Sequence, residues 1–494
     1  MRHSAQFKPN SRRVWYGRDA IGRRSLLIAR SADDVESGEA THAHGGAGSS
    51  SDADAEWRRR FALSSVADTL GAWPGCAPIG LNDWQEVRPG VHCFDLRTGR
   101  HELFAWTDKL LSDISLQSRE RVLVPCDRDP CDASDGRGHK TSGDAAQASP
   151  GDASLPRHRS LPPPVPPGLD EHTRSVLRAL DAAVAIRVRA IRQSLIVCAG
   201  GIHGSSNSTA APTPFAIGFS GGVDSCILAA LLDRHLPPHC AIDLANVSFD
   251  GEAAPDRINA RAALSELTAL APRRLWRLIC IDVSQGDADA VRPRVTELIT
   301  PGNTFMDLNI GTALWYAAKA EGYIETGGAS APYRSPAKVF FVGTGIDEQA
   351  AGYGRHFSKF RDAGWTGLQE ELSLDVRRLW SRNLGRDDRL VADHGREARH
   401  PFLDEDFMAA LLAVPLEIVA DLRLPRGEGD KRIVREVAAA LGLHVAARRV
   451  KRAIQFGSRV AKLSNRRYFG SNRAANAARA GSHRLIEADV GGNP

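Results

Sequence analysis

The segment FAIGFSGGVDSCILAALL, residues 215–232, joins a short apolar run to a longer one through a few small or polar residues. The first run has the length of a buried β-strand, and the second has the composition of a helix. Glycines in a strand-to-helix turn leave backbone N–H groups uncovered beside a helix N-terminus, which is an arrangement that binds anions. The segment therefore predicts a phosphate-binding turn. The alternative is an ordinary tight turn in which a serine or aspartate only caps the helix.

The side chains of this turn favour a nucleotide with a bound cation. Ser220 and Ser225 can donate hydroxyl hydrogen bonds to phosphate, and Gly221 and Gly222 allow a close approach of the backbone. Asp224 would repel phosphate unless a cation lies between them, so its presence predicts Mg²⁺. The turn lacks the lysine-containing pattern of a Walker loop, so it does not predict transfer of a γ-phosphate.

Strand-like and helix-like runs alternate around this turn. We expect helices at 176–191, 226–236 and 256–270, and strands at 215–219, 242–249, 277–283 and 338–345. Such alternation is typical of βαβ units with a parallel sheet. Ligands of these sheets bind outside the carboxyl ends of the strands. The glycines of the 220–225 turn and those that end the strand at 338–345 both fall there. The sequence therefore predicts an α/β fold with its site at that edge.

The rest of the chain divides by composition. Short apolar runs at 13–30, 60–67 and 85–97 suggest strands, whereas 31–56 and 127–168 are rich in Ser, Gly, Asp and Pro. Segments with few large apolar side chains cannot offset the entropy of ordering. We predict a partial β-rich domain at 1–126, a disordered linker at 127–168, an α/β domain at 169–462 and a disordered tail at 463–494.

Composition excludes several classes of protein. The 494 residues carry a net charge of only +5, so we expect no dedicated nucleic-acid surface. The eight cysteines form no C-x-x-C pair, which argues against a zinc ribbon or an iron–sulfur cluster. The first residues lack the apolar core of a signal peptide, and no run approaches 18 apolar residues. We therefore expect a reduced, cytoplasmic protein without a membrane span; the sequence indicates no oligomeric state.

The SGGVDS turn resembles the pyrophosphate loop of the ATP pyrophosphatase superfamily. Four further segments resemble, in the same order, segments of asparagine synthetases and β-lactam synthetases. They are VGTGIDEQAAGYGRH (342–356), GREARHPFLDEDF (395–407), KRIVREVAAALGL (431–443) and KRAIQFGSR (451–459). The segments APDRINARAALSEL (254–267) and PGNTFMDLNIGTALWYAA (301–318) resemble the asparagine synthetase domain-containing branch in particular. In the N-terminal part, VWYGRDAIGRRSLL (14–27) and WQEVRPGVHCFDL (84–96) resemble strands of a class II glutamine amidotransferase domain.

The resemblance implies a parallel-sheet ATP pyrophosphatase domain that cleaves ATP to AMP and pyrophosphate through an acyl-adenylate. It implies ATP and Mg²⁺ as cofactors, a small carboxylate (aspartate) as substrate, and ammonia or glutamine as the source of nitrogen for asparagine biosynthesis. It assigns ATP binding to Ser220, Gly221, Gly222, Asp224, Ser225, Gly343 and Gly345, Mg²⁺ binding to Asp224 and Asp347, and catalysis to Lys451 and Glu348.

Other roles remain open for some of these residues. Lys451 could be a solvated surface lysine, and Asp347 with Glu348 could cap a helix after the strand. Arg399 and Asp404 could form an ion pair below the pocket or contact the ligand.

The sequence also departs from the family pattern. Class II amidotransferases use an N-terminal cysteine as nucleophile, but Arg2 follows Met1 and the first cysteine is Cys76. Either Met1 is not the true start or the glutaminase is inactive. For this chain as written we expect no glutamine hydrolysis, and we expect free ammonia or another amine to be used. Thr344 stands where asparagine synthetases have a glutamate thought to act as base, and threonine cannot accept a proton at neutral pH. No arginine lies between 295 and 333, where an aspartate-binding arginine is expected.

These observations leave three hypotheses. The leading one is an ATP-dependent, AMP-forming amide ligase of the asparagine synthetase type. The alternative is a nucleotide-binding scaffold or regulator that keeps the fold without the chemistry, as Thr344 suggests. A tRNA-thiolating enzyme would need paired cysteines and a basic RNA-binding face, and Cys226 has no evident partner in the sequence.

Overall fold

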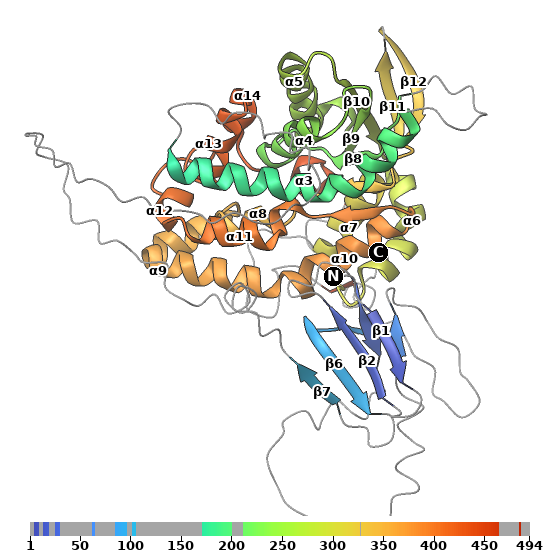
Figure 1. Cartoon of the computed structure of the whole chain (residues 1–494), viewed down its shortest axis with the longest axis vertical. Coiled ribbons are helices and arrows are strands. Elements are labelled where there is room, and N and C mark those ends of the chain that lie inside the picture. Colours follow the sequence, from blue (N-terminus) through green and yellow to red (C-terminus); the bar gives the residue numbers. More distant parts are fainter. Residues whose placement is uncertain are drawn as a thin grey trace, which may run out of the picture.

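The computed structural model describes part of the chain at residue level (Figure 1). The described residues are 4–8, 13–18, 25–29, 62–64, 84–95, 101–104, 170–199, 211–326, 328–463 and 484–485. The predicted linker at 127–168, Cys76 and nearly all of the predicted tail lie outside these ranges. The prediction that the linker and the tail are disordered therefore stays a prediction.

The N-terminal part forms a small unit of antiparallel strands, drawn in blue below the rest of the molecule in Figure 1. One sheet has the order β1-β2-β6-β7, with strands Ser4–Lys8, Arg13–Arg18, Gly90–Asp95 and His101–Phe104. A second has the order β4-β3-β5, with strands Ala62–Ser64, Leu27–Ala29 and Trp84–Glu86. The predicted runs at 13–30, 60–67 and 85–97 all contain strands, whereas β1 and β7 were not predicted. We call these two sheets the N-terminal β unit.

The larger unit is built on a sheet of seven strands in the order β12-β11-β10-β9-β8-β13-β14. The strands are β8 (Phe215–Gly218), β9 (Ala241–Ser248), β10 (Leu275–Asp282), β11 (Glu321–Thr326), β12 (Ala329–Arg334), β13 (Val339–Phe341) and β14 (Glu397–Arg399). Neighbouring strands pair in parallel throughout the set β10, β9, β8, β13 and β14. Strands β11 and β12 add an antiparallel hairpin at one edge. The predicted α/β class with a parallel sheet is confirmed.

Alternation along the central strands explains why the sheet is covered on both faces. In β8, Phe215 and Ile217 belong to one apolar cluster and Ala216 to another. The same two-residue alternation separates Ile279 from Leu278 in β10. Because successive side chains point to opposite faces, each face carries its own core.

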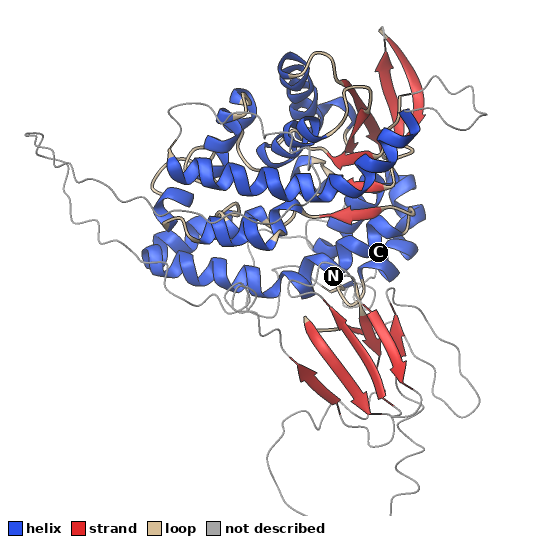
Figure 2. Ribbon diagram, in the orientation of Figure 1, coloured by secondary structure: helices blue, strands red, loops and turns tan. Residues whose placement is uncertain are grey.

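Helices cover the two faces in the order that βαβ connections require. The first cluster includes side chains of α3 (Glu171–Ala199), α4 (Val223–His235), α5 (Pro255–Leu270), α11 (Glu405–Leu412), α13 (Arg432–Ala440) and α14 (His444–Ala447). The second includes side chains of α6 (Gln285–Ile299), α7 (Phe305–Lys319) and α10 (Gly385–Ala392). Figure 2 shows these helices in blue around the red strands.

The remaining elements also belong to the larger unit. They are η5 (Gly251–Ala253), α8 (Ile346–Gln349), α9 (Gly354–Leu379), the π-helical turn η6 (Trp380–Leu384), η7 (Pro401–Leu403), α12 (Leu416–Val419), α15 (Ile454–Gly457) and η8 (Val460–Lys462). Helix α9 is interrupted at Ala363 and Gly364, whose backbone angles are not helical. None of the helices in the described ranges is both long and apolar enough to cross a bilayer.

Candidate active site

The SGGVDS turn connects the end of β8 to the start of α4, as the sequence predicts. Gly222 is the N-cap of α4, and its N–H donates to Ser220 Oγ at 3.3 Å. Ser225 Oγ donates to the carbonyl of Gly222 at 3.1 Å. Helix α4 is buried from Val223 to Leu232, so the sheet and the neighbouring helices fix the position of its N-terminus. The turn thus presents a helix N-terminus at the carboxyl end of a central strand.

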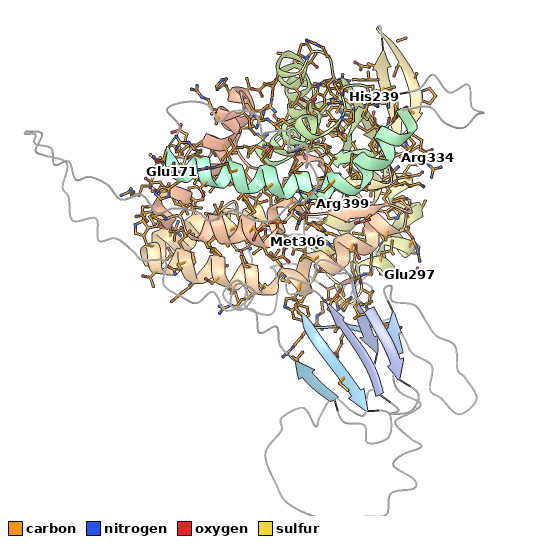
Figure 3. The ribbon with its side chains drawn as sticks, in the orientation of Figure 1. Glu171, His239, Glu297, Met306, Arg334 and Arg399 are labelled. Carbon is orange, nitrogen blue, oxygen red and sulfur yellow. The ribbon has the colours of Figure 1, made fainter. Side chains whose placement is uncertain are left out.

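A cavity of about 500 Å³ opens at this edge of the sheet. Seven of the predicted site residues line it, namely Ser220, Asp224, Ser225, Gly343, Asp347, Glu348 and Lys451. The cavity also contacts α7 through Met306, which Figure 3 labels near the middle of the larger unit. A cavity of this size is ordinary for a small-molecule site.

Three predicted ATP-binding glycines do not line the cavity. Gly221 has φ +69°, and a Cβ there would lie 2.4 Å from the backbone of Asn259, so this glycine lets the turn pack against α5. Gly345 has φ +106°, and a Cβ would lie 2.3 Å from the side chain of Leu403. Gly222 is the helix N-cap. All three shape the site from outside the cavity.

Two aspartates and two lysines form a compact charged cluster, which we call the Asp–Lys cluster. Lys431 Nζ lies 2.7 Å from Asp224 Oδ2 and 2.7 Å from Asp347 Oδ1. Lys451 Nζ lies 2.6 Å from Asp347 Oδ2 and 3.7 Å from Asp224 Oδ2. The two predicted magnesium ligands are therefore brought together, and Lys451 is a cavity residue rather than a solvated surface lysine.

Burial and charge act in opposite directions on the cluster. Burial alone would raise the pKa of Asp347, but the ammonium groups of Lys431 and Lys451 outweigh it and hold this pKa below its usual range. Burial would lower the pKa of Lys451, and the carboxylates of Asp347 and Asp224 instead raise it. Asp347 and Lys451 are therefore both charged at neutral pH.

Lys431 is the member of the cluster that the sequence did not assign to the site. It is completely buried, and its backbone has φ +54°, which is uncommon for a residue with a side chain. Its N–H donates to the carbonyl of Ala350, which ties the start of α13 to the end of α8. The sequence offered one signal that could have pointed to Lys431: this residue stands directly before a helix, in a chain that has only nine lysines.

Glu348 lies beside the cluster and has two hydrogen-bonding partners of its own. Tyr353 Oη donates to Glu348 Oε1 at 2.6 Å, and Asn383 Nδ2 donates to the same oxygen at 3.2 Å. Glu348 Oε2 is buried, and no described residue hydrogen-bonds to it. Burial, and then the negative charge of Asp347, raise the pKa of Glu348 to about 7. A buried carboxylate with one uncommitted oxygen thus lines the cavity. The N-cap of α8 is Gly345, and Asp347 and Glu348 lie in the first turn of this helix.

Thr344 also points toward a carboxylate. Its hydroxyl donates to Asp387 Oδ2 at 3.2 Å, and Asp387 lines the cavity from α10. The guanidinium of Arg386 lies 2.9 Å from the other carboxylate oxygen. An acidic side chain is therefore present next to position 344, although position 344 itself carries none.

Arginines line the cavity from α9, η6 and α10, and only Arg355 lies in a segment that the sequence analysis singled out. The segment from α9 through η6 into α10, which we call the arginine wall, contributes four arginines to the lining, namely Arg355, Arg378, Arg382 and Arg386. The absence of arginine between 295 and 333 therefore does not leave the cavity without guanidinium groups.

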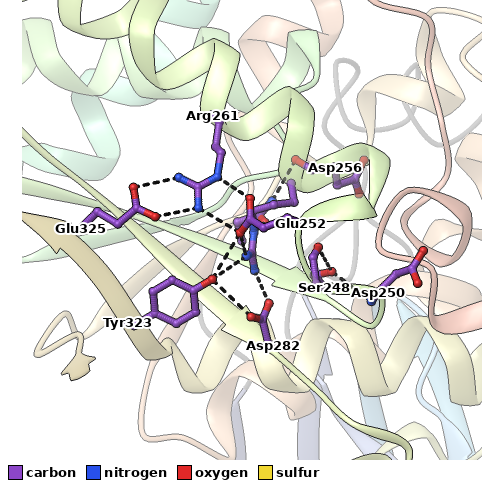
Figure 4. A network of polar contacts seen from close by, with 11 residues as sticks. Ser248, Asp250, Glu252, Asp256, Arg261, Asp282, Tyr323 and Glu325 are labelled. Carbon is purple, nitrogen blue, oxygen red and sulfur yellow. Dashed lines mark hydrogen bonds and ion pairs between the residues drawn. The ribbon is translucent and has the colours of Figure 1, made fainter. Parts of the chain in front are cut away.

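A second polar network braces the rim of the cavity beside β9 and β10 (Figure 4). Arg257 is completely buried and donates to Asn246 Oδ1 at 2.7 Å. Asn246 lines the cavity and donates in turn to the carbonyl of Phe219 at 2.8 Å. Arg261 forms ion pairs with Glu252 and Glu325 at the outer side of the same network. These contacts fix β9 against the start of the SGGVDS turn.

Neither of the two roles left open for Arg399 and Asp404 describes the contacts that these residues make. Arg399 and Asp404 do not pair with each other and do not line the cavity. Asp404 instead pairs with Arg187 at 2.7 Å and caps α11, while the Arg399 guanidinium contacts the carbonyl of Arg187. Both residues thus anchor α3 through Arg187.

The cysteines of the described residues do not favour sulfur transfer. Cys226, Cys240 and Cys280 are buried and form no disulfide within the described part of the chain. Burial raises the pKa of the Cys226 thiol to about 12, so this group stays protonated.

Comparisons with known proteins show what this chain is similar to. The family model described as asparagine synthase matches residues 205–363 and 346–476, which together span more than half of the chain. The asparagine synthetase domain-containing protein 1 of Gallus gallus is 42% identical over 342 residues, which cover 60% of this chain and 53% of that protein. The protein of the same name from Homo sapiens is 40% identical over 291 residues, covering 50% and 45%.

A more distant relative carries the name of an enzyme. The asparagine synthetase (glutamine-hydrolyzing) of Gallus gallus is 27% identical over 218 residues, covering 44% of this chain and 34% of that protein. The chain spans about half the length of the two domain-containing relatives that it matches. With the fold, the nucleotide-type turn and the family match in agreement, the chain belongs to the asparagine synthase family.

Proposed function

We propose that this chain is an ATP-dependent, AMP-forming amide ligase that acts on a small carboxylic acid. The observation that carries the proposal is the convergence, around one cavity, of the SGGVDS turn with the Asp–Lys cluster. The turn supplies a helix N-terminus for phosphate, and the cluster supplies two ammonium groups where charge develops on a leaving pyrophosphate. The match to the asparagine synthase family supports the same class of reaction.

The residues present fit a magnesium ion. Mg²⁺ is commonly held by one or two carboxylates together with substrate phosphates. Asp224 and Asp347 share the cluster, and Asp224 Oδ1 is buried with no hydrogen-bond partner among the described residues. No group of three or more metal-ligating side chains occurs in the described ranges, which suits an ion that binds together with a nucleotide. When bound, the ion would neutralise the phosphates of ATP.

The reaction follows from where the charges lie. A carboxylate oxygen of the substrate attacks the α-phosphorus of ATP, and the bond to the β-phosphate oxygen breaks to release pyrophosphate. Lys451 and Lys431 stabilise the negative charge on that leaving group. Ammonia then attacks the carbonyl carbon of the acyl-adenylate, AMP leaves, and one proton of the former ammonia must be removed.

The proton acceptor that we propose is Glu348. It lines the cavity, its Oε2 has no partner among the described residues, and Tyr353 and Asn383 hold its other oxygen in place. Asp387 beside Thr344 is engaged by Arg386 and by the threonine hydroxyl, so it is less available as a base. Aspartate as the acid, and hence asparagine as the product, are proposed from the family alone.

Exchange of labelled pyrophosphate into ATP tests the adenylation step directly. We expect exchange that depends on Mg²⁺ and on an added carboxylic acid, in a panel of amino acids and simple acids. Lys451→Ala should reduce it by at least 100-fold, because a transition-state charge contact is lost, whereas Lys462→Ala, which removes an exposed lysine paired with Asp250, should leave it unchanged. Amide formation is then assayed with ammonia supplied directly. Absence of exchange with every acid would refute the ligase.

A nucleotide-binding scaffold or regulator is the second candidate. It is favoured by Thr344 at the position of the family's base, and by an Asp–Lys cluster whose charges are already paired without ligand. Cells that carry Asp224→Ala together with Lys451→Ala distinguish the two candidates. A ligase loses its cellular function in that variant, whereas a scaffold that does not need catalysis keeps it.

A further inference from the structure

The two lysines of the Asp–Lys cluster stand at places where no helix or strand fixes the backbone. Lys451 lies in the stretch 449–453 between α14 and α15, which is neither helical nor extended in a sheet. Lys431 has φ +54° and directly precedes α13. An irregular backbone is held by the groups that bind its own polar atoms, because it has no ladder of hydrogen bonds. Other contacts must therefore keep both ammonium groups against the same two aspartates.

One buried guanidinium reaches both of these places. Arg435 of α13 is only 6% exposed. Its Nε donates to the carbonyl of Asp430 at 2.6 Å, and its Nη2 lies 2.6 Å from Asp430 Oδ2. Its Nη1 donates to the carbonyls of Ala447 and Arg449, both at 2.8 Å. Arg435 thus joins the start of α13, where Lys431 stands, to the backbone directly before the stretch of the second lysine.

The same brace extends to the SGGVDS turn. The guanidinium of Arg449 contacts the carbonyl of Gly221 in that turn. At the other end, Asp430 is 1% exposed, and its Oδ1 accepts a hydrogen bond from the N–H of Gly427 at 2.5 Å. A continuous set of polar contacts therefore runs from the loop before α13, through Arg435, to the phosphate-binding turn.

Arg435 is placed behind the site and not in it. Neither Arg435 nor Asp430 lines the cavity. A guanidinium suits this position because it is planar, stays charged and carries donors that point in several directions. An ammonium group carries its donors on one nitrogen, so it could keep the ion pair with Asp430 but not reach the carbonyls of α14 and its neighbour as well. The chemistry of arginine is therefore used fully at this position.

We propose that Arg435 is a positioning residue, which holds Lys431 and Lys451 in place for the pyrophosphate that leaves ATP. The inference rests on the proposed function, since it explains how the groups that bind the leaving pyrophosphate are placed. A displacement of about 1 Å caused by a change outside the reacting centre can reduce a rate about 100-fold. Loss of the brace should therefore weaken the site although no group that contacts the ligand is removed.

A double-mutant cycle on the full chain tests this role without requiring turnover. Mg·pyrophosphate is titrated calorimetrically into the wild type, Arg435→Lys, Lys451→Ala and the variant that carries both substitutions. Arg432→Lys is the matched control, because Arg432 belongs to the same helix, is 43% exposed and pairs only with Asp421 and Glu436 among the described residues. Thermal unfolding establishes that each variant is folded.

Arg435→Lys should fold, because it keeps a positive charge opposite Asp430. If it does not, Asp430→Asn takes its place in the cycle, since this change weakens the hold on Arg435 and keeps a hydrogen-bond acceptor. Neither substitution alters a residue that lines the cavity.

We expect Lys451→Ala to weaken pyrophosphate binding about 10- to 100-fold, the range of a charge-assisted hydrogen bond. Arg435→Lys should weaken it about 5-fold in the wild-type background but less than about 2-fold in the Lys451→Ala background, because residues that act through one another are not additive. The rate of pyrophosphate exchange should fall about 10- to 100-fold in Arg435→Lys. Arg432→Lys should match the wild type in both measurements.

Three results would overturn the assignment. The first is unchanged pyrophosphate affinity in folded Arg435→Lys, and the second is an equal loss in both backgrounds, which is the behaviour of a residue that only stabilises the fold. The third is a folded wild type that does not bind Mg·pyrophosphate.

Failure of the ligase is a separate result. A wild type that shows no pyrophosphate exchange with any acid refutes the ligase, while a non-additive cycle on pyrophosphate affinity keeps the role of Arg435. Exchange by the wild type together with an additive cycle refutes the positioning role and keeps the ligase.

Discussion

At the residue scale, the site depends on how a completely buried lysine neutralises two aspartates. Lys431 lies 2.7 Å from a carboxylate oxygen of both Asp224 and Asp347. Lys431→Met keeps the bulk of the side chain but leaves the carboxylates to repel each other. We expect a loss of about 3–5 kcal/mol in the free energy of unfolding, partly restored by Mg²⁺, which can supply the missing positive charge.

Thermal unfolding with and without MgCl₂ measures this effect. Lys462→Met is the control, since that lysine is exposed and pairs only with Asp250 within the described residues. If Lys431→Met were as stable as the wild type, or if Mg²⁺ stabilised both variants equally, the proposed electrostatic role of Lys431 would be wrong.

Asp256 gives the site a dependence on pH. It lines the cavity, and burial raises its pKa to about 7, although Lys451 and Arg452 act to lower it. Between pH 4 and 7 the folded chain keeps a proton here that the unfolded chain has lost, so this group's contribution to stability falls as the pH rises. The slope is on the order of 1 kcal/mol per pH unit. Denaturation of the wild type and of Asp256→Asn at several pH values checks this slope. The free energy of unfolding of the wild type, relative to that of Asp256→Asn, should fall as the pH rises from 4 to 7. A difference that does not change with pH would contradict the assignment.

At the scale of elements, the nucleotide-type turn depends on a close contact between β8–α4 and α5. Gly221 combines φ +69° with backbone atoms 2.4 Å from where a Cβ would lie, whereas Gly251 has φ +54° and open space. Gly251→Ala should therefore cost only the left-handed backbone penalty of about 1–2 kcal/mol. Gly221→Ala should cost clearly more and should also weaken Mg·ATP binding. Chemical denaturation of both variants tests this, and equal losses would show that the contact with α5 is not important.

Predictability from the sequence also differs between elements. The strands and helices between 215 and 283 could be predicted from the apolar runs, because buried strands and helices alternate there as βαβ units. The β11–β12 hairpin was not predicted, because its strands at 321–334 are largely exposed and lack an apolar pattern. Asp224 and Asp347 could be predicted because each follows a strand of the sheet. Lys431 and Arg382 could not, since only the tertiary arrangement of α13 and the π-helical turn brings them to the same cavity.

At the scale of the whole molecule, one buried ion pair links the N-terminal β unit to the wall of the cavity. Arg389 of α10 pairs with Glu86 of β5 at 2.6 Å, with side chains 1% and 4% exposed, and also donates to Ser25 Oγ. A Cβ at Gly385 would lie 2.0 Å from Glu86, so the contact reaches the end of the π-helical turn. The β unit therefore braces the segment that carries Arg382.

Removal of Glu86 should accordingly be costly. Glu86→Ala leaves Arg389 buried without its carboxylate, and we expect a loss of about 3–5 kcal/mol in the free energy of unfolding. Glu86→Gln, which keeps a hydrogen-bond acceptor, should lose less. The control is Glu297→Ala, which breaks an exposed ion pair with Arg294 and should cost under about 1 kcal/mol. Denaturation curves in which Glu86→Ala matches this control would mean that the two units are not coupled through Arg389.

The measurement that tests the central claim most directly is calorimetric titration of ATP into the purified, folded chain, with and without Mg²⁺. The account predicts saturable binding at one site that requires Mg²⁺ and is lost in the double variant Asp224→Asn, Asp347→Asn. Absence of binding by the folded wild type, or binding that the double variant retains unchanged, would contradict it.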